Sequence, residues 1–276
     1  MHHTQPLFVQ GSGPQGAPTL LFLHGGGGEA WMWQPVISRL PEYHCLAVDL
    51  PEHGQSRAVA PFRMASAAEQ VAQTLRAQAH GGKATVIGLS EGAQVAVQLL
   101  ATAPELVEKA LISSALLRPI PGMGWATTPA MLKWTYRLSI PPFRDNDWWI
   151  RINMKYATGI PDEYFPAFKK SFQETTESQF VNLMHANQTF RLPPNLSRAS
   201  APSLILAGKK EYGAMKQSAR DLVAALPNAR GGLINLGKQA SLANEHNWAL
   251  AAPDLFAQTV RAWVEGTALP KEIESL

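Results

Sequence analysis

One pentapeptide of the 276-residue chain has the pattern of a serine nucleophile. The sequence reads G-x-S-x-G over residues 88–92, directly after the apolar run 85–87 and directly before the helical pattern 93–100. So tight a strand-to-helix turn forces its central residue, Ser90, into strained backbone geometry, and the flanking glycines leave the space that the turn needs. The serine hydroxyl then lies at a helix N-terminus, where the amide of Glu91 and the helix dipole can stabilise an oxyanion. This pattern predicts nucleophilic catalysis by Ser90.

A serine hydroxyl needs a general base, which is almost always a histidine held by a carboxylate. Of the eight histidines, His246 alone follows the last predicted strand, 233–236, and precedes the closing helix. A loop at that place emerges at the carboxyl edge of a doubly wound sheet, where Ser90 is also expected. His24 and His53 precede glycine in turns, which favours structural hydrogen bonding. We therefore expect His246 to be the base.

The acid of such a triad should come from a strand end between the serine and the histidine. Glu211 follows the apolar run 204–206 through a short polar turn. The preceding strand end, 113–116, contains no acid that could serve instead. We therefore expect Glu211 to orient His246 and to stabilise its imidazolium form.

The elements that must position these residues alternate between strands and helices. Runs that are apolar throughout suit strands buried on both faces of a parallel sheet. The expected strands are 19–23, 43–49, 84–89, 109–113, 202–208 and 233–236, and the expected helices are 35–40, 65–80, 91–103, 215–226 and 253–265. This alternation predicts an α/β fold with a doubly wound, mostly parallel sheet.

The alternation of expected strands and helices stops after residue 117. Residues 118–198 hold no convincing strand, but they contain aromatic residues at helical spacing and several proline pairs. We expect a helical insertion of about four helices over 118–198, carried by a core domain of residues 1–117 and 199–276. An apolar pocket lined by insertion residues is one hypothesis, and the candidates for it are Met123, Trp125, Met131, Trp134, Phe143, Trp148 and Trp149.

Taken together, these motifs make the chain similar to members of the α/β-hydrolase superfamily, in the esterase-like branch with a helical lid. The resemblance covers nearly the whole chain. Its motifs are His24-Gly25-Gly26 with Trp33, the turn Asp49-Leu50-Pro51-Glu52-His53-Gly54-Gln55-Ser56, the elbow 88–92, Gly208–Glu211, and His246-Asn247-Trp248 with the terminal helix from Pro253.

The resemblance implies a cofactor-free serine esterase in which 118–198 forms the lid. The amides of Gly26 and Glu91 would be the oxyanion-hole donors, with Gly27 as a substitute for Gly26. Two positions depart from the family pattern: Glu211 stands where most relatives have Asp, and Glu245 stands where a glycine usually precedes the histidine. The expected substrates are small to medium esters with apolar or aromatic acyl or alcohol groups.

Several other functions remain open. The spacing of Gly25, Gly27 and Ala30, with Asp49 further on, also matches a relaxed dinucleotide-binding pattern. The residues after the glycines begin a phosphate-binding helix poorly, and this alternative leaves Ser90 and His246 without a role. Within the same fold, a lactonase, a carbon–carbon bond hydrolase, a thioesterase, a cofactor-free dioxygenase or a non-catalytic ligand receptor would share these motifs.

Composition narrows the class of partner. The net charge of +3 is small and scattered, which argues against nucleic-acid binding. The single cysteine, Cys45, excludes a disulfide framework and a cysteine-based zinc site, and no metal-ligand spacing occurs. No apolar run is long enough for a membrane span, and the N-terminal residues lack the pattern of a secretory signal. We expect a cytoplasmic protein that acts on a small-molecule ester, whose oligomeric state the sequence leaves open.

Overall fold

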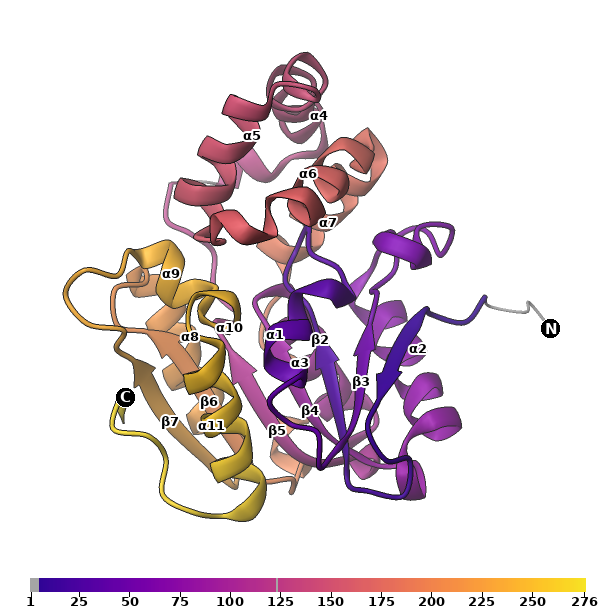
Figure 1. Ribbon diagram of the computed structural model, residues 1–276, viewed down its shortest axis with the longest axis vertical. Helices are drawn as coiled ribbons and strands as arrows, with labels where there is room; N and C mark the ends of the chain where they lie inside the picture. The colour runs from indigo at the N-terminus through magenta and orange to yellow at the C-terminus, as the bar shows by residue number, and fades with distance from the viewer. Residues whose placement is uncertain (1–4, 123) are drawn as a thin grey trace.

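The computed structural model describes residues 5–122 and 124–276, and its centre is an eight-stranded sheet (Figure 1). The strand order is β1-β3-β2-β4-β5-β6-β7-β8. Strands β3 to β7 and β2 are parallel to one another, whereas β1 and β8 pair antiparallel at the two edges. The strands are β1 (Val9–Ser12), β2 (Thr19–Leu23), β3 (His44–Val48), β4 (Ala84–Leu89), β5 (Val107–Ser113), β6 (Ser203–Gly208), β7 (Ala229–Ile234) and β8 (Ile273–Ser275).

Helices cover both faces of this sheet and bury two separate apolar cores. Alternate residues of β2 show the division, since Leu21 and Leu23 belong to one core and Leu20 and Phe22 to the other. The first core is closed by α2 (Met64–Gln78), α3 (Glu91–Thr102) and α8 (Gly213–Ala225). The second core is closed by α1 (Gln34–Ile37), α10 (Trp248–Ala251) and α11 (Pro253–Glu265). Helix α9 (Leu242–His246), which precedes α10 in the chain, lies near the carboxyl ends of the strands.

The described residues between β5 and β6 form helices and no strand. They contain α4 (Pro129–Ser139), α5 (Asp147–Ile152) continued by a π-helical turn (Asn153–Thr158), α6 (Phe165–Glu174) and α7 (Glu177–Thr189). Side-chain caps at Thr128, Asn146 and Thr176 begin three of these helices. The group stands above the carboxyl ends of the parallel strands, in magenta to salmon in Figure 1. It therefore covers the edge at which an α/β sheet binds its ligands.

The expected fold class is confirmed, with three differences in the strands. The edge strands β1 and β8 were not expected, because each is short, polar and paired on one side only. Strand β7 lies at Ala229–Ile234 rather than at 233–236. Its two middle residues are Gly231 and Gly232, which lack the side chains that mark a strand in a sequence. Here the neighbouring strands, and not local propensity, decide where the strand begins.

No helix formed by the described residues is both long enough and apolar enough to cross a lipid bilayer.

Candidate active site

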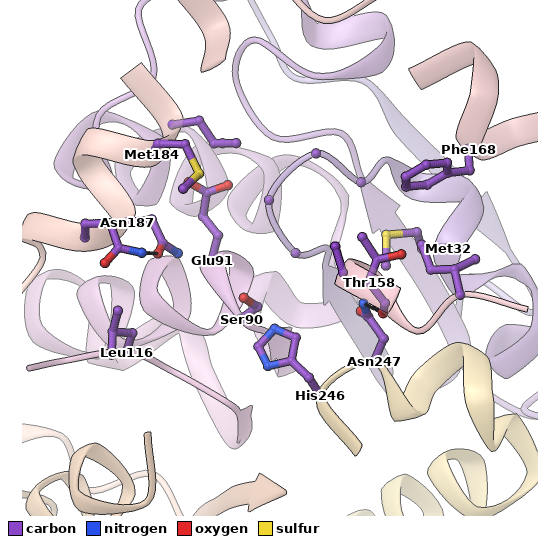
Figure 2. Close-up of a pocket in the computed structure, with 18 of the residues that line it drawn as sticks. Met32, Ser90, Glu91, Leu116, Thr158, Phe168, Met184, Asn187, His246 and Asn247 are labelled. Carbon is purple, nitrogen blue, oxygen red and sulfur yellow. Dashed lines mark hydrogen bonds between the residues drawn. The ribbon is translucent and has the colours of Figure 1, made fainter. Parts of the chain in front are cut away.

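Ser90 lies at the turn between β4 and α3, in a backbone conformation that side chains rarely adopt. Its φ of 54° and ψ of −112° lie outside the strand and helix regions, so the turn is strained. Hydrogen bonds hold this conformation: the Ser90 amide donates to the Ser113 carbonyl at 2.8 Å, and the Ser90 carbonyl accepts from the Gln94 amide at 3.1 Å. The turn presents the serine side chain to a cavity above the sheet (Figure 2).

The two glycines of the pentapeptide lie where no side chain fits. A Cβ on Gly92 would be 2.2 Å from the carbonyl oxygen of Leu23, and a Cβ on Gly88 would be 2.5 Å from the carbonyl oxygen of Gly92. Both obstacles are backbone atoms of packed elements, which cannot move aside as a flexible side chain can. The glycines therefore allow α3 to start close against β2 and β4.

Glu211 and His246 contact each other although they are 35 residues apart in the chain. Oε1 of Glu211 lies 2.5 Å from Nδ1 of His246, and Oε2 accepts a hydrogen bond of 2.8 Å from the amide of Gly208. The Glu211 side chain is almost fully buried. With a proton on Nδ1, the other ring nitrogen of His246 is an acceptor, and Figure 2 shows the ring beside Ser90. The structure thus brings together the three residues expected from the sequence.

A second buried carboxylate, that of Glu245, connects the two loops that carry this pair. Its Oε2 accepts a 2.6 Å hydrogen bond from the amide of Lys210, and its Oε1 accepts a longer one of 3.4 Å from the amide of Leu236. The side chain of Glu245 has no exposed surface. The sequence analysis recorded this residue only as a departure from glycine. Its position directly before His246 was the one signal available.

The residues after His246 fix its loop to the sheet and to the helical segment above. Trp248 is fully buried, and its Nε1 donates to Oγ of Ser113 at 3.0 Å. The side-chain amide of Asn247 donates to the carbonyl of Thr158 in the π-helical turn. His246 is therefore held from below by the core and from above by the segment that covers the site.

The loop after β2 places a backbone amide beside Ser90. The carbonyl of Gly25 accepts from Nδ1 of His24 at 2.8 Å and from the amide of Gly28 at 3.0 Å. The carbonyl of Gly25 and the amide of Gly26 belong to one trans peptide, so they point in opposite directions. A Cβ on Gly25 would be 3.4 Å from Cβ of Ser90. The amide of Gly26 therefore points away from the side on which the Gly25 carbonyl is bonded, and Gly26 lines the cavity.

The amide of Gly27, the expected substitute for Gly26, already has a partner. It donates to Nε2 of His53 at 3.3 Å, and Nδ1 of His53 in turn contacts the carbonyl of Pro51 at 2.9 Å. Burial lowers the pKa of His53 to about 3 and the pKa of His24 to about 4, so both rings are neutral at neutral pH. These two histidines shape the glycine loop rather than take part in proton transfer.

Asp49, the acid of the dinucleotide-binding alternative, has a structural role in the same loop. Its Oδ1 accepts from the amide of Ala30 at 2.7 Å, and its Oδ2 accepts from the amide of Gln55 at 2.8 Å. Asp49 is buried, so both oxygens are committed to backbone groups. This geometry gives no support to recognition of a ribose by Asp49.

A cavity of about 420 Å³ contains Ser90, His246 and the glycine loop. A second hollow of about 260 Å³ continues from it beneath the helical segment and shares Gly26, Phe168 and Met184 with it. The described residues that line the two hollows include no lysine and no arginine. The second hollow is lined mainly by apolar side chains, among them Ile140, Phe168, Phe172, Phe180, Leu183 and Met184. The space beside Ser90 thus suits an uncharged, largely apolar group.

The six described residues that were candidates for lining an apolar pocket do not line this cavity or the second hollow. Trp125, Trp134 and Trp148 are each more than 60% exposed, and Trp149 stacks on Phe143 with ring centroids 4.4 Å apart. Met131 does not line the cavity either, and Met123 lies outside the described residues. For these six residues the hypothesis was wrong, because helical spacing places aromatic residues on one face but does not say whether that face turns to the sheet or to solvent.

The side chain of Glu91 was also missed, since the sequence analysis used only its backbone amide. As the first residue of α3, Glu91 offers that amide next to Ser90. Its carboxyl group is fully buried, and neither oxygen has a hydrogen-bond partner among the described residues. Burial raises its pKa well above the ordinary value, and the nearby Glu52 raises it further. An acidic residue at the start of an otherwise apolar helix was the available signal.

The curated relatives of this chain carry names of several different activities. A mycobacterial protein named an esterase, from Mycobacterium tuberculosis, is 44% identical over 93 residues, which are 33% of this chain and 30% of the relative. The first curated relatives are matched over only 30% to 38% of their own length.

Solved structures match over almost the whole chain. A hydrolase from Pseudomonas aeruginosa has a TM-score of 0.73 at 20% identity, with 94% of each chain covered. An enol-lactonase from Burkholderia xenovorans has a TM-score of 0.70 at 20% identity, with 94% of this chain and 96% of that one covered. At such identity the likeness shows the fold alone. The sequence profile described as the alpha/beta hydrolase family matches residues 20–260, and the chain therefore belongs to the alpha/beta hydrolase family.

Proposed function

We propose that this protein is a serine hydrolase that cleaves carboxylic esters, with Ser90 as nucleophile, His246 as general base and Glu211 as the acid that orients it. One observation carries the proposal: Glu211 contacts Nδ1 of His246 at 2.5 Å, and His246 lines the same cavity as a strained Ser90. Structural packing alone would require neither the strained serine nor a buried carboxylate directed at a histidine that reaches the cavity.

The chemistry follows from this arrangement. Oγ of Ser90 bonds to the ester carbonyl carbon while its proton passes to Nε2 of His246, and the carbonyl oxygen becomes an oxyanion. The carbon–oxygen bond to the leaving group then breaks, and His246 returns the proton to the departing alkoxide. A water molecule repeats the attack on the acyl-enzyme with His246 as base, and the products are a carboxylic acid and free Ser90. Glu211 stabilises the imidazolium in both halves.

The oxyanion is stabilised by two backbone amides that approach from different elements. Gly26 contributes the amide of the loop after β2, and Glu91 contributes the first amide of α3, where the helix dipole adds to the effect. Since the amide of Gly27 already donates to His53, Gly26 is the better donor of the two. This pairing supports acyl transfer over reactions that do not pass through an oxyanion.

The cavity supports small to medium esters with apolar or aromatic groups. No cation lines the described part of the cavity to attract an anionic substrate, and the hollow of about 260 Å³ offers an apolar space for one side of the ester. We propose that residues 118–198 act as a lid over this space, on a core of residues 1–117 and 199–276. The name of the mycobacterial relative, an esterase, agrees with this class of reaction.

The proposal is tested with p-nitrophenyl butyrate and p-nitrophenyl octanoate. We expect Ser90→Ala to lower kcat by at least about 10³-fold with either ester. Ser114→Ala is a matched control, because Ser114 is also a buried serine with positive φ (60°) at a strand end. Ser114→Ala should hydrolyse both esters nearly as well as the unaltered protein. Equal activity of Ser90→Ala and Ser114→Ala, or no hydrolysis by the unaltered protein, would refute the proposed ester hydrolysis.

A further inference from the structure

The Glu91 side chain is a buried acid that the proposed mechanism does not use. Figure 2 shows its carboxyl group turned away from His246 and toward Met184. A Cβ on Gly26 would be 3.3 Å from Oε2 of Glu91 and 3.4 Å from Cδ2 of Leu183. The carboxyl group is therefore packed against the peptide that carries one oxyanion donor, while the amide of Glu91 is the other donor.

Apart from the N-terminus of α3, at which Glu91 lies, the described surroundings of this carboxyl group contain nothing that would stabilise a negative charge. Helix α7 contributes Leu183, Met184 and Asn187 on this side, and none of them titrates. The amide of Asn187 is already paired with Gln94. Neither carboxyl oxygen of Glu91 has a hydrogen-bond partner in the described part of the chain.

The titratable groups that face Glu91 do not offset a charge on it either. The turn after β3 contributes Glu52, a buried carboxylate that accepts from the amide of Phe62 and from Asn182. The rings of His24 and His53 are neutral, since burial lowers their pKa values to about 4 and about 3. His246 lies on the far side of Ser90 (Figure 2). Burial, and then the charge of Glu52, raise the pKa of Glu91 well above its ordinary value.

We propose that Glu91 must be a neutral carboxylic acid for the hydrolase to work, and that ionisation of this side chain inactivates the oxyanion hole at alkaline pH. The inference rests on the proposed function, because it concerns the oxyanion of the Ser90 reaction. An ionised Glu91 places a second negative charge beside Gly26 at the moment when the substrate oxygen becomes negative. In a site from which water is excluded, this repulsion opposes the transition state directly. The Glu91 side chain touches no reacting atom and acts through the two amides.

The test is the pH dependence of kcat/KM for p-nitrophenyl butyrate, between about pH 6 and pH 10. We expect the activity of the unaltered protein to fall by about 10-fold or more on the alkaline side. Glu91→Gln keeps the shape and the amide but cannot ionise, so its activity should stay level there. Glu52→Gln removes the neighbouring charge, so its alkaline fall should move to lower pH. Glu29→Gln is the matched control: burial also raises the pKa of Glu29, yet its carboxyl group bonds Ser171.

A second measurement keeps the inference testable if Glu91→Gln does not fold. In infrared difference spectra of the unaltered protein, the carbonyl band of an un-ionised carboxylic acid should disappear over the same pH range in which activity falls. The inference is overturned if the alkaline loss of activity persists in Glu91→Gln or vanishes in Glu29→Gln. It is also overturned if the unaltered protein shows neither a loss of activity at alkaline pH nor the carbonyl band of an un-ionised carboxylic acid. Failure of the proposed function is recognised separately, because Ser90→Ala would then be as active as the unaltered protein, or the unaltered protein would hydrolyse neither ester at any pH.

Discussion

The carboxylate of Glu245 accepts a 2.6 Å hydrogen bond from the backbone amide of Lys210. Lys210 immediately precedes Glu211, and Glu245 immediately precedes His246, so this bond joins the two loops one residue away from the Glu211–His246 contact. The side chain of Lys210 adds a second connection, since its Nζ donates to the carbonyl of Gly237 at 2.8 Å. The relative position of Glu211 and His246 therefore depends on a carboxylate that touches neither of them by hydrogen bonding.

Replacing Glu245 should lower activity because Glu211 and His246 are then less well positioned, and not because a group that takes part in the reaction is lost. Glu245→Ala removes the charged acceptor of a partly buried hydrogen bond from the Lys210 amide, and we expect a loss of about 1–3 kcal/mol in the free energy of unfolding. We also expect a lower kcat at nearly unchanged KM, because the acid and the base lose their common anchor. Glu245→Gln retains one acceptor oxygen and should recover much of both losses. Urea unfolding measures the loss of stability, and ester kinetics on the same preparations measure the loss of kcat. A Glu245→Ala variant that is as stable and as active as the unaltered protein would contradict the anchoring role.

The identity of the triad acid is tested by Glu211→Gln. An amide that still accepts from Gly208 presents its NH₂ group to Nδ1 of His246, which favours the wrong imidazole tautomer for accepting the serine proton. By this reasoning kcat should fall by about 10⁴-fold. Glu211→Asp keeps the charge on a shorter arm, so its loss should be far smaller. If Glu211→Gln stays within about 10-fold of the unaltered protein, another acid must orient His246.

Acid should destabilise the fold through the two buried histidines of the glycine loop. The pKa of His24 is about 4 and that of His53 about 3 in the folded protein, against 6.5 for an ordinary histidine. Below pH 6.5 the unfolded chain therefore binds protons that the folded chain does not, and stability falls as pH decreases. For His24 alone the lowering from 6.5 to about 4 corresponds to on the order of 3 kcal/mol.

Urea unfolding at intervals between pH 6.5 and about 4.5 measures this slope. His53→Gln should make stability less dependent on pH in that window, because one of the two buried groups no longer titrates. His185→Gln serves as the control, since His185 is exposed and should leave the slope unchanged. A slope that is the same in all three proteins would show that the buried histidines are not its cause.

The apolar hollow should determine preference for acyl-chain length. Phe180 lines the hollow of about 260 Å³ but not the space beside Ser90. Phe180→Ala should therefore lower kcat/KM for p-nitrophenyl octanoate several-fold and leave the butyrate ester nearly unaffected. Trp134→Ala is the control, because Trp134 is 63% exposed and lines neither hollow. An unchanged ratio of octanoate to butyrate in Phe180→Ala would place the acyl chain elsewhere.

The sequence alone was enough to predict the family, the parallel sheet and the meeting of residues 90, 211 and 246. The apolar runs determine which segments are central strands, and parallel strands direct all their carboxyl ends to one edge. A residue placed directly after such a strand therefore reaches that edge whatever the details of packing. Gly88 is readable for a similar reason, since its obstacle is backbone of the same local unit, whereas the obstacle at Gly92 is the Leu23 carbonyl of the neighbouring strand β2.

Only the tertiary structure decided which way the remaining side chains face. In the folded protein the side chains of Trp125, Trp134 and Trp148 face solvent, whereas Phe168 and Met184 line the cavity. Glu245 and Glu91 are buried by elements far away in the chain. Their roles depend on contacts with Lys210 and Gly26, which no local pattern specifies. Periodicity fixes a residue's place on its own element, but burial and charge state arise from what the fold packs against that element.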